Sequence, residues 1–311
     1  MRAYVLPATG EEAAVTDAPP PGDPGPGEVR IRVRCSSVNP SDRMMAGGFF
    51  RWMEHHYPAV LGRDFAGTID AVGDGVTRFT TGDEVFGFVK RPYVGDGTFA
   101  EYVTIPADRY AVHRPPGLSV EDVGDLGVAG ATALQCVDAL ACAAGETVLI
   151  NGATGGVGSF AVQLARRAGL RVIATAHGSD AEQHVRFLGA TATVDWTTGD
   201  LADQVRALAP DGVDGIVDLV SSDQDAITAL ARPVLAPGRA VAATRSGSSH
   251  ADFTVHGVHC SPALDLLHRL ADAAVDGLVV PRVASHPLDK IEDAFAALAR
   301  APLGKVGLEV A

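Results

Sequence analysis

The first third of the chain alternates hydrophobic and polar residues in short runs that predict β-strands. Residues 29–34 alternate in the way a half-exposed strand does, and further strands are expected over 67–72, 84–88 and 99–105. Gly-Asp turns separate these runs, and a segment rich in proline and glycine precedes the first of them. The pattern predicts a β-rich domain over residues 1–119.

From about residue 119 short apolar runs alternate with Ala-rich helical segments such as 159–167. Strands followed by crossover helices are typical of βαβ units, so we predict a doubly wound parallel α/β sheet over residues 120–275. The expected strands of this sheet are 147–151, 171–175, 191–194, 215–220, 239–243 and 253–258.

The last part of the chain returns to a mixed pattern. A strand is expected near 278–283, a helix over 288–300 and a final strand over 305–310. We therefore expect residues 276–311 to complete the first domain.

Composition and charge narrow the class of protein. Of 311 residues 47% are hydrophobic and 20% are charged, a balance typical of a globular protein of about two domains. The net charge of −13 and the lack of basic clusters argue against a nucleic-acid or membrane-surface partner. No apolar stretch reaches the roughly 20 residues of a membrane-spanning helix. We expect a soluble, cytoplasmic protein.

A glycine-rich loop lies between the expected strand 147–151 and a helix that opens near Ser159. Three of its four glycines, at 152, 155 and 158, recur at every third position, which lets backbone amides and a helix N-terminus approach a pyrophosphate. This context predicts a dinucleotide site, formed by Gly152, Ala153, Thr154, Gly155, Gly156, Val157 and Gly158.

The end of the second strand decides between the two nicotinamide dinucleotides. A carboxylate there would accept a hydrogen bond from a ribose 2′-hydroxyl and repel a 2′-phosphate. No carboxylate ends this strand, and Thr175, His177 and Ser179 can donate hydrogen bonds to a phosphate, although Asp180 follows closely. The sequence favours NADPH over NADH.

Several segments together resemble one enzyme family. Residues 38–42, 57–67, 130–133, 155–158 and 304–308 resemble, in order, motifs of the medium-chain dehydrogenase/reductase superfamily, in particular its zinc-free quinone oxidoreductase (zeta-crystallin-like) branch. The resemblance implies a GroES-like catalytic domain built from both ends of the chain, a Rossmann NADP-binding domain, and an active site in the cleft between them.

The resemblance also bears on metals. Zinc-dependent relatives carry catalytic ligands at positions that correspond to Asn39, Arg63-Asp64 and about Val128. Asn39 and Arg63 are poor zinc ligands, because zinc prefers thiolate, imidazole or carboxylate. The four cysteines are scattered and form no Cys-x-x-Cys pair. We expect no metal.

A quinone is already electrophilic, so its reduction needs only a hydride donor in position and hydrogen-bond donors near the oxygen that gains charge. The resemblance places Asn39 beside the nicotinamide and the substrate and Thr132 on the nicotinamide side. Tyr57 or Arg63 is expected near the entrance, and Lys305 is assigned to the cofactor-binding residues. The expected activity is metal-independent hydride transfer from NADPH to a quinone or an activated enone.

Two alternatives stay open. Related enoyl thioester reductases commonly place a proton-donating tyrosine shortly after a glycine, where this chain has Phe49 and Phe50, which cannot donate a proton. These phenylalanines, with Trp52 and Tyr57, could form an aromatic wall for a planar acceptor. The second alternative is an NADPH-binding regulatory or structural protein with little turnover.

The resemblance further predicts a homodimer, joined near strand 253–258.

Overall fold

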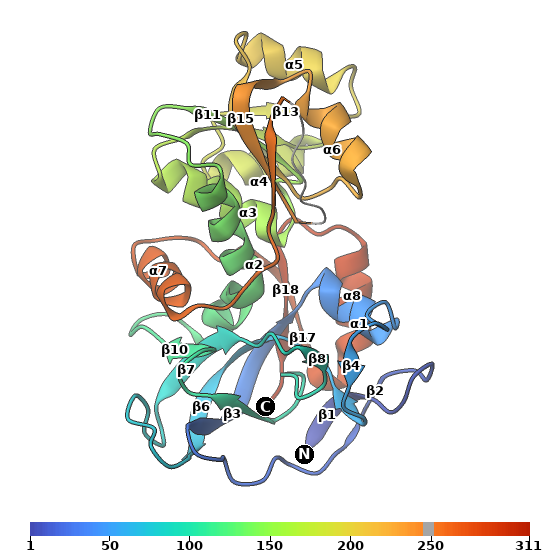
Figure 1. Cartoon of the computed structure of the whole chain (residues 1–311), viewed down its shortest axis with the longest axis vertical. Helices are drawn as coiled ribbons and strands as arrows, with labels where there is room; N and C mark the ends of the chain where they lie inside the picture. The colour runs from blue at the N-terminus through green and yellow to red at the C-terminus, as the bar shows by residue number, and fades with distance from the viewer. Residues whose placement is uncertain (245–251) are drawn as a thin grey trace. The chain divides into compact units, whose positions relative to one another are not determined.

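The computed structural model describes residues 1–244 and 252–311, which divide into two compact units. The first consists of Met1–Val128 and Ser261–Ala311, the second of Ala129–Cys260. Both chain ends lie in the first unit (Figure 1). The predicted boundaries at residues 119 and 275 lie nine and fifteen residues from the unit boundaries at residues 128 and 260.

The main sheet of the first unit is mixed and is centred on the long strand β3 (Glu28–Val38). Its order is β10-β7-β6-β3-β18-β17, and β9 also pairs with β3. The other strands of this sheet are β6 (Asp64–Val72), β7 (Glu84–Phe88), β9 (Tyr102–Pro106), β10 (Ala111–His113), β17 (Arg282–Pro287) and β18 (Lys305–Glu309).

Smaller elements complete the first unit. A second sheet has the order β2-β1-β5, and β4 pairs with β8. These strands are β1 (Arg2–Leu6), β2 (Ala14–Asp17), β4 (Glu54–His55), β5 (Ala59–Val60) and β8 (Tyr93–Val94). The helices are α1 (Pro40–Ala46), α7 (Leu264–Val275), the 3-10 turn η1 (Leu288–Lys290) and α8 (Ile291–Ala299).

The C-terminal segment completes the first unit through backbone pairing. Strand β18 lies antiparallel to β3, with Val306 opposite Val38 and Leu308 opposite Ser36. The prediction of a strand over 278–283 was wrong in position, because β17 begins only at residue 282. Gly277 ends α7 with a left-handed φ of +91°, and Pro281 has no N–H to donate to a ladder.

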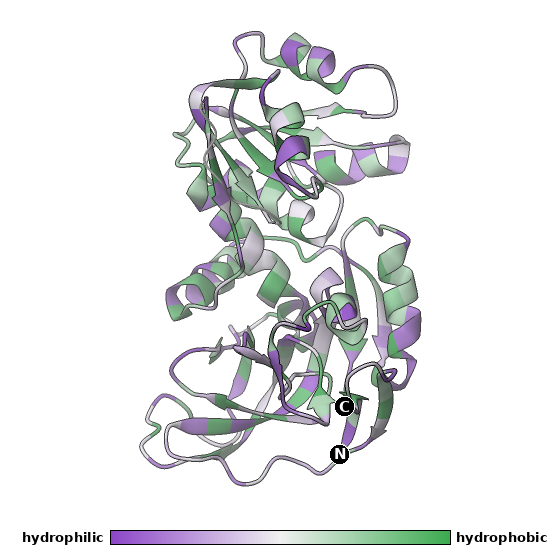
Figure 2. Cartoon of the chain, turned by 45° about the vertical axis from the view of Figure 1, so that its right-hand side comes forward, coloured by the Kyte–Doolittle hydropathy of each residue, from purple (hydrophilic) through white to green (hydrophobic). Residues whose placement is uncertain are grey.

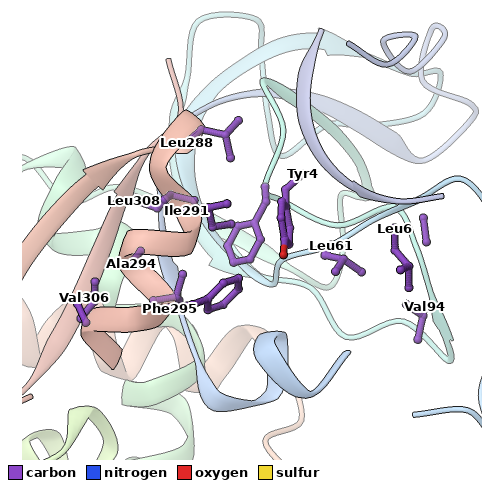
Figure 3. Close-up of a cluster of buried hydrophobic side chains, with 14 residues drawn as sticks. Tyr4, Leu6, Leu61, Val94, Leu288, Ile291, Ala294, Phe295, Val306 and Leu308 are labelled. Atoms are coloured by element: carbon purple, nitrogen blue, oxygen red, sulfur yellow. The ribbon is translucent and has the colours of Figure 1, made fainter. Parts of the chain in front are cut away.

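A hydrophobic core joins three distant parts of the first unit (Figure 3). Tyr4 of β1 and Phe295 of α8 lie with ring centroids 6.0 Å apart, and Phe99 lies 6.4 Å from each of these rings. Leu61 and Val306 are buried in the same cluster. This packing fixes the C-terminal helix against the N-terminal strand and explains why both chain ends belong to one unit.

The observed unit boundaries follow from close packing of the long helix α2 (Val120–Ala139). A Cβ atom at Gly124 would lie 3.0 Å from the Cβ of Cys35, and one at Gly127 would lie 2.5 Å from Asp64 Oδ1. Only glycine allows the start of this helix to come so close to β3 and β6. Helix α7 packs against β10, so it too belongs to the first unit.

The second unit is a six-stranded parallel sheet in the order β13-β12-β11-β14-β15-β16, which confirms the predicted doubly wound fold. Figure 2 shows hydrophobic residues along its strands. Leu149, Ile173 and Ile216 are buried in one hydrophobic cluster of this unit. Its strands are β11 (Thr147–Asn151), β12 (Arg171–Thr175), β13 (Ala192–Val194), β14 (Val213–Asp218), β15 (Leu235–Ala243) and β16 (Thr254–Gly257). Its crossover helices are α3 (Gly156–Arg167), α4 (Ser179–Phe187), α5 (Leu201–Leu208) and α6 (Gln224–Ala231).

Candidate active site

The glycine loop of the second unit connects β11 to α3 and has the shape of a phosphate cradle. Gly152 has a φ of +83°, and its N–H donates to Thr175 Oγ1 at 2.9 Å. A Cβ at Gly158 would lie 2.1 Å from the Gly152 carbonyl oxygen, so the helix rests directly on the loop. At Gly155, the N-cap of α3, the nearest atom to an added Cβ is 3.8 Å away. The Gly155 backbone is thus open at a helix N-terminus, which fits a pyrophosphate.

The rest of this loop is held by α3. Ala153 is buried, and Ser159 Oγ donates to the Thr154 carbonyl oxygen at 3.3 Å. Gly156 and Val157 form the first turn of the helix. Thr132, also predicted for the cofactor side, is buried on α2 in the second unit.

Sequence reasoning missed a carboxylate beside the loop. The strand order reverses between β11 and β14, the position where ligands bind in doubly wound sheets. At this point Asn151 Nδ2 donates to Asp218 Oδ1 at 3.0 Å, and the same oxygen accepts from the Val220 and Ser221 amides at 3.1 and 3.2 Å. Asp218 therefore shapes the turn next to Gly152. Its place at the end of an apolar strand was the available signal.

Thr175, at the end of β12, was predicted to donate a hydrogen bond to a phosphate. Thr175 is buried, and its hydroxyl accepts from the Gly152 N–H and donates to the Ile150 carbonyl oxygen at 3.4 Å. Its single O–H is thus used inside the fold, so Thr175 supports the glycine loop and has no hydrogen to donate to a phosphate.

His177 and Ser179 are exposed, but both have acidic neighbours. His177 Nδ1 lies 3.2 Å from Asp195 Oδ2, and Ser179 Oγ donates to Asp180 Oδ1 at 3.3 Å. The Thr197 N–H and hydroxyl lower the pKa of Asp195, and His177 lowers it further. Asp195 follows the next strand along the sheet and was not recognised from the sequence. Asp195 and Asp180 make the electrostatic potential less positive at the end of β12, where we expect the adenosine ribose of a dinucleotide.

A buried polar cluster lies in the first unit around Asp64, which we call the Asp64 cluster. Asp64 is fully buried, and its carboxylate accepts from Ser37 Oγ at 2.6 Å, Asn39 Nδ2 at 2.8 Å and the Val128 N–H at 2.6 Å. The ammonium nitrogen of Lys305 lies 3.6 Å from the same carboxylate. A buried charge with this many donors is well compensated.

Asn39 and Lys305 were predicted to lie at the cofactor, but both form internal hydrogen bonds in the Asp64 cluster. Lys305 Nζ donates to Asn39 Oδ1 at 2.8 Å and to the Val38 carbonyl oxygen at 3.5 Å, and it pairs with Asp64. The Asn39 amide nitrogen donates to Asp64 and, at 3.4 Å, to the Ser37 carbonyl oxygen. Both Asn39 amide hydrogens thus have internal acceptors, and the Lys305 ammonium donates to Asn39 Oδ1 and, more weakly, to the Val38 carbonyl oxygen while it faces Asp64 at 3.6 Å. Both side chains are therefore engaged inside the Asp64 cluster.

The cluster gathers the positions that the resemblance equates with zinc ligands. Asn39 and the Val128 N–H both donate hydrogen bonds to the Asp64 carboxylate, and the ammonium group of Lys305 supplies a positive charge beside it. In residues 1–244 and 252–311, no three His, Cys, Asp or Glu side chains come together in a way that could hold a metal ion.

Asp42 is a second buried carboxyl near this cluster. One of its oxygens accepts from the Asn39 N–H at 2.8 Å, and the other is buried without a hydrogen-bond partner. Burial raises the pKa of Asp42 to about 7, against the opposing charge of Arg63. Asp42 therefore holds a proton up to near-neutral pH, although the sequence offered it only as part of a motif.

Asp42 should make stability depend on pH. Its pKa is raised on folding, so between about pH 4 and 7 the folded chain keeps a proton that the unfolded chain loses, and stability falls as pH rises. We expect Asp42→Asn, which cannot titrate, to remove this part of the slope. The variant should match the wild type near pH 4 and exceed it by up to about 4 kcal/mol above pH 7. Urea unfolding of both proteins across this range measures the difference, and parallel curves would contradict the assignment.

Two pockets flank the segment that follows α1. The larger one, the Tyr57 pocket, has a volume of about 750 Å³. Tyr57 lines it, shares a hydrogen bond with Thr9 Oγ1 at 2.9 Å and stacks on His55. The pocket is also lined by apolar residues and by charges of both signs, among them Glu11, Glu12, Arg43, Arg51 and Glu292.

The second pocket, the Arg63 pocket, has a volume of about 130 Å³. Its charged lining residues are Arg63, Lys90 and Arg91, and none of the described residues that line it is acidic. Its walls are apolar or aromatic and include Met45, Phe50, Met53, Val60, Leu61, Val89, Tyr93 and Val94. Tyr57 and Arg63, the two alternative candidates for the entrance, thus line different pockets.

The predicted aromatic wall forms only in part. The rings of Phe49, Phe50 and Trp52 lie within 5.3 to 5.4 Å of one another. Tyr57 is not among them, because it stacks on His55 instead. Phe49 and Trp52 are exposed, and of these three only Phe50 lines the Arg63 pocket.

Two family models match the chain in order and together cover more than half of it. Residues 25–117 match the alcohol dehydrogenase GroES-like domain, and residues 156–245 match the zinc-binding dehydrogenase domain. With the fold described above, these matches show that the chain belongs to the medium-chain dehydrogenase/reductase superfamily and is an oxidoreductase of that family.

Curated relatives include domains of much longer proteins. The chain is 40% identical over 184 residues, 59% of its length, to the phthioceranic/hydroxyphthioceranic acid synthase of Mycobacterium tuberculosis, of which it covers 8%. It is 31% identical over 219 residues to the human mitochondrial NAD(P)H oxidoreductase RTN4IP1, over 64% of this chain and 54% of that protein. The chain thus spans at most about half the length of these relatives.

Solved structures match the whole chain. A quinone oxidoreductase from Pseudomonas syringae is 26% identical with a TM-score of 0.86, and 100% of both chains is covered. Mycobacterial Rv1454c, solved in complex with NADPH, is 25% identical with a TM-score of 0.83, again over 100% of both chains. Among the described residues, no helix combines the length and the apolar character needed to cross a membrane.

Proposed function

We propose that the protein reduces quinones or activated enones with NADPH and without a metal. The observation that carries this proposal is the Arg63 pocket, whose three cations and apolar walls suit a conjugated carbonyl compound. The matches to a quinone oxidoreductase and to an NADPH complex of the same fold support it.

The glycine loop is the proposed cofactor site. The open backbone at Gly155, the left-handed Gly152 and the N-terminus of α3 fit a pyrophosphate, and a bound nicotinamide dinucleotide would supply the hydride. The absence of a carboxylate at the end of β12 and the exposed His177 support NADPH, against the opposing charge of Asp195. Because these effects oppose each other, we propose a modest preference for NADPH over NADH.

Charge decides which pocket receives the acceptor. Reduction of a carbonyl places negative charge on its oxygen, and donors aimed at that oxygen stabilise the transition state. The Tyr57 pocket is lined by three glutamates, which would oppose this charge, whereas the charged residues among the described lining of the Arg63 pocket are all cations. Arg63 is the proposed donor, because its Nε and Nη1 contact Val89 O at 3.3 Å and Ser41 Oγ at 3.4 Å and leave three N–H groups for an acceptor oxygen.

The Asp64 cluster is proposed to hold this donor in place. Arg63 precedes Asp64 at the start of β6, and the three hydrogen bonds to the Asp64 carboxylate fix the backbone there. Lys305 balances the buried negative charge without taking part in hydride transfer.

A panel of acceptors tests the proposal. We expect oxidation of NADPH by ortho- and para-quinones in the presence of a chelator, faster than oxidation of NADH. An alkyl enone and a crotonyl thioester complete the panel. Binding of NADPH with no oxidation by any acceptor would instead support a regulatory or structural protein.

Reduction of an enoyl thioester is the second candidate, favoured by the 40% identity to part of the phthioceranic/hydroxyphthioceranic acid synthase. The Arg63 pocket offers little for the proton that this reaction needs. Phe50 cannot donate one, and the Tyr93 hydroxyl already donates to Asp96 at 2.7 Å. Burial raises the pKa of Tyr93 to about 12. Turnover of the thioester alone would establish this candidate.

Arg63 should matter for turnover more than for folding. We expect Arg63→Gln to lower kcat/KM for a neutral quinone about tenfold, because one charge-assisted hydrogen bond to the developing oxyanion is lost. Arg300→Gln, at an exposed position after α8, is the matched control and should leave the rate unchanged. Steady-state kinetics of the two variants measure the effect, and equal rates would remove Arg63 from the mechanism.

A further inference from the structure

The Arg63 pocket carries more positive charge than one carbonyl oxygen needs. Three cations line it, and no described lining residue is acidic, although the whole chain has a net charge of −13. The local charge is therefore opposite in sign to the charge of the chain. A neutral quinone would use only one or two of the donors on this surface.

The guanidinium groups keep donors available. Neither Arg63 nor Arg91 has a carboxylate within 4 Å among the described residues. Arg91 Nη2 donates to the Thr104 carbonyl oxygen at 2.6 Å, and its guanidinium lies 5.7 Å from the ring centroid of Tyr110. Its Nε is enclosed by the fold and is not available to a ligand. Its Nη1 makes no hydrogen bond to a described residue, and this group is the donor that an anionic ligand would use.

The apolar walls of the pocket are adaptable. Three of the four methionines of the chain, Met44, Met45 and Met53, lie within ten residues of one another, and two of them line the pocket beside Phe50. Methionine side chains adjust to irregular ligand shapes and contact aromatic rings favourably. The volume of about 130 Å³ suits one ring and a small substituent, and it is below the range of pockets that enclose drug-sized ligands.

We infer that the Arg63 pocket selects acceptors that carry an anionic substituent, such as a sulfonate, carboxylate or phosphate, on a conjugated ring. The inference rests on the proposed function and names its substrate class. The substituent takes no part in the bond changes: the quinone gains one hydride from NADPH and one proton from solvent to become the hydroquinone, and NADPH becomes NADP⁺. Lys90 and Arg91 bind the substituent, while Arg63 faces the reacting carbonyl.

A pair of related quinones tests the selection. We compare kcat/KM for 1,4-benzoquinone and for its 2-sulfonate in the wild type, in Lys90→Gln/Arg91→Gln and in the control Arg300→Gln. Intrinsic reactivity differs between the two quinones, so the decisive quantity is the change in their ratio on mutation. We expect the ratio of kcat/KM for the sulfonate to kcat/KM for the neutral quinone to fall about tenfold in the double variant. High salt should reduce the same preference in the wild type.

Binding without turnover provides an independent measurement. Calorimetric titration should show that the wild type binds benzenesulfonate about tenfold more tightly than phenol. The double variant should bind the two compounds with equal affinity. An unchanged ratio in the double variant, in both kinetics and binding, would overturn the inference. Failure to reduce the neutral quinone would count against the proposed function alone, since the calorimetric comparison needs no turnover.

Discussion

Replacing Lys305 with methionine is expected to lower the free energy of unfolding of the first unit by about 3–5 kcal/mol. The ammonium group lies 3.6 Å from the fully buried Asp64 carboxylate and donates to Asn39 Oδ1. Methionine fills a similar volume but leaves a buried negative charge without its cation and an amide oxygen without its donor. The two tryptophans make the measurement specific, because Trp52 lies in the first unit and Trp196 in the second. Urea unfolding followed by Trp52 fluorescence, in a Trp196→Phe background, reports on the first unit.

Two further variants control this result. Lys290→Met removes an exposed lysine at the start of α8 and should change stability by less than about 0.5 kcal/mol. The double variant Lys305→Met/Asp64→Asn should recover part of the loss, because it removes both charges together. If Lys305→Met were as stable as Lys290→Met, the buried pair would not hold the cluster together.

Two glycines of the phosphate loop should respond in opposite ways to alanine. At Gly155 the new Cβ meets no atom nearer than 3.8 Å and φ is −75°, so Gly155→Ala should fold normally. The methyl group would nevertheless occupy the side from which a pyrophosphate approaches, and we expect NADPH affinity to fall about a hundredfold, or roughly 2.7 kcal/mol. Fluorescence titration of NADPH and the midpoint of thermal unfolding measure the two properties separately.

Gly158→Ala is the matched comparison. Its Cβ would lie 2.1 Å from the Gly152 carbonyl oxygen and 2.6 Å from the Cα of Ala153, so the loop and α3 must separate. We expect a loss of several kcal/mol in the stability of the second unit, followed by Trp196 in a Trp52→Phe background. Unchanged NADPH binding in Gly155→Ala would mean that the loop is a tight turn and not a cofactor site.

Periodicity alone predicted much of the second unit. The expected strands 147–151 and 171–175 coincide with β11 and β12, because short buried strands between amphipathic helices give an unambiguous pattern. The domain boundaries were harder to place. They depend on where α2 and α7 pack, and that depends on the space at Gly124 and Gly127 and not on any local preference.

The side chains of the candidate site were less predictable than the elements that carry them. Residue type indicated that Thr175 and Lys305 could donate hydrogen bonds, but not that internal acceptors already use their hydrogens. The Asp64 cluster joins residues up to 268 positions apart, Ser37 and Lys305, through the pairing of β18 with β3. Lys90 and Arg91 did carry a local signal, two cations directly after a buried strand.

We propose that the Arg63 pocket, in which no described lining residue is acidic, and the glycine loop together make this chain a metal-independent quinone reductase. The initial rate of NADPH oxidation by 1,4-benzoquinone, with chelator present, tests this proposal in the wild type and in Arg63→Gln. We expect rapid oxidation that the chelator does not slow and that falls about tenfold in the variant. NADPH consumption that requires an added metal ion, or that is the same in both proteins, would contradict it.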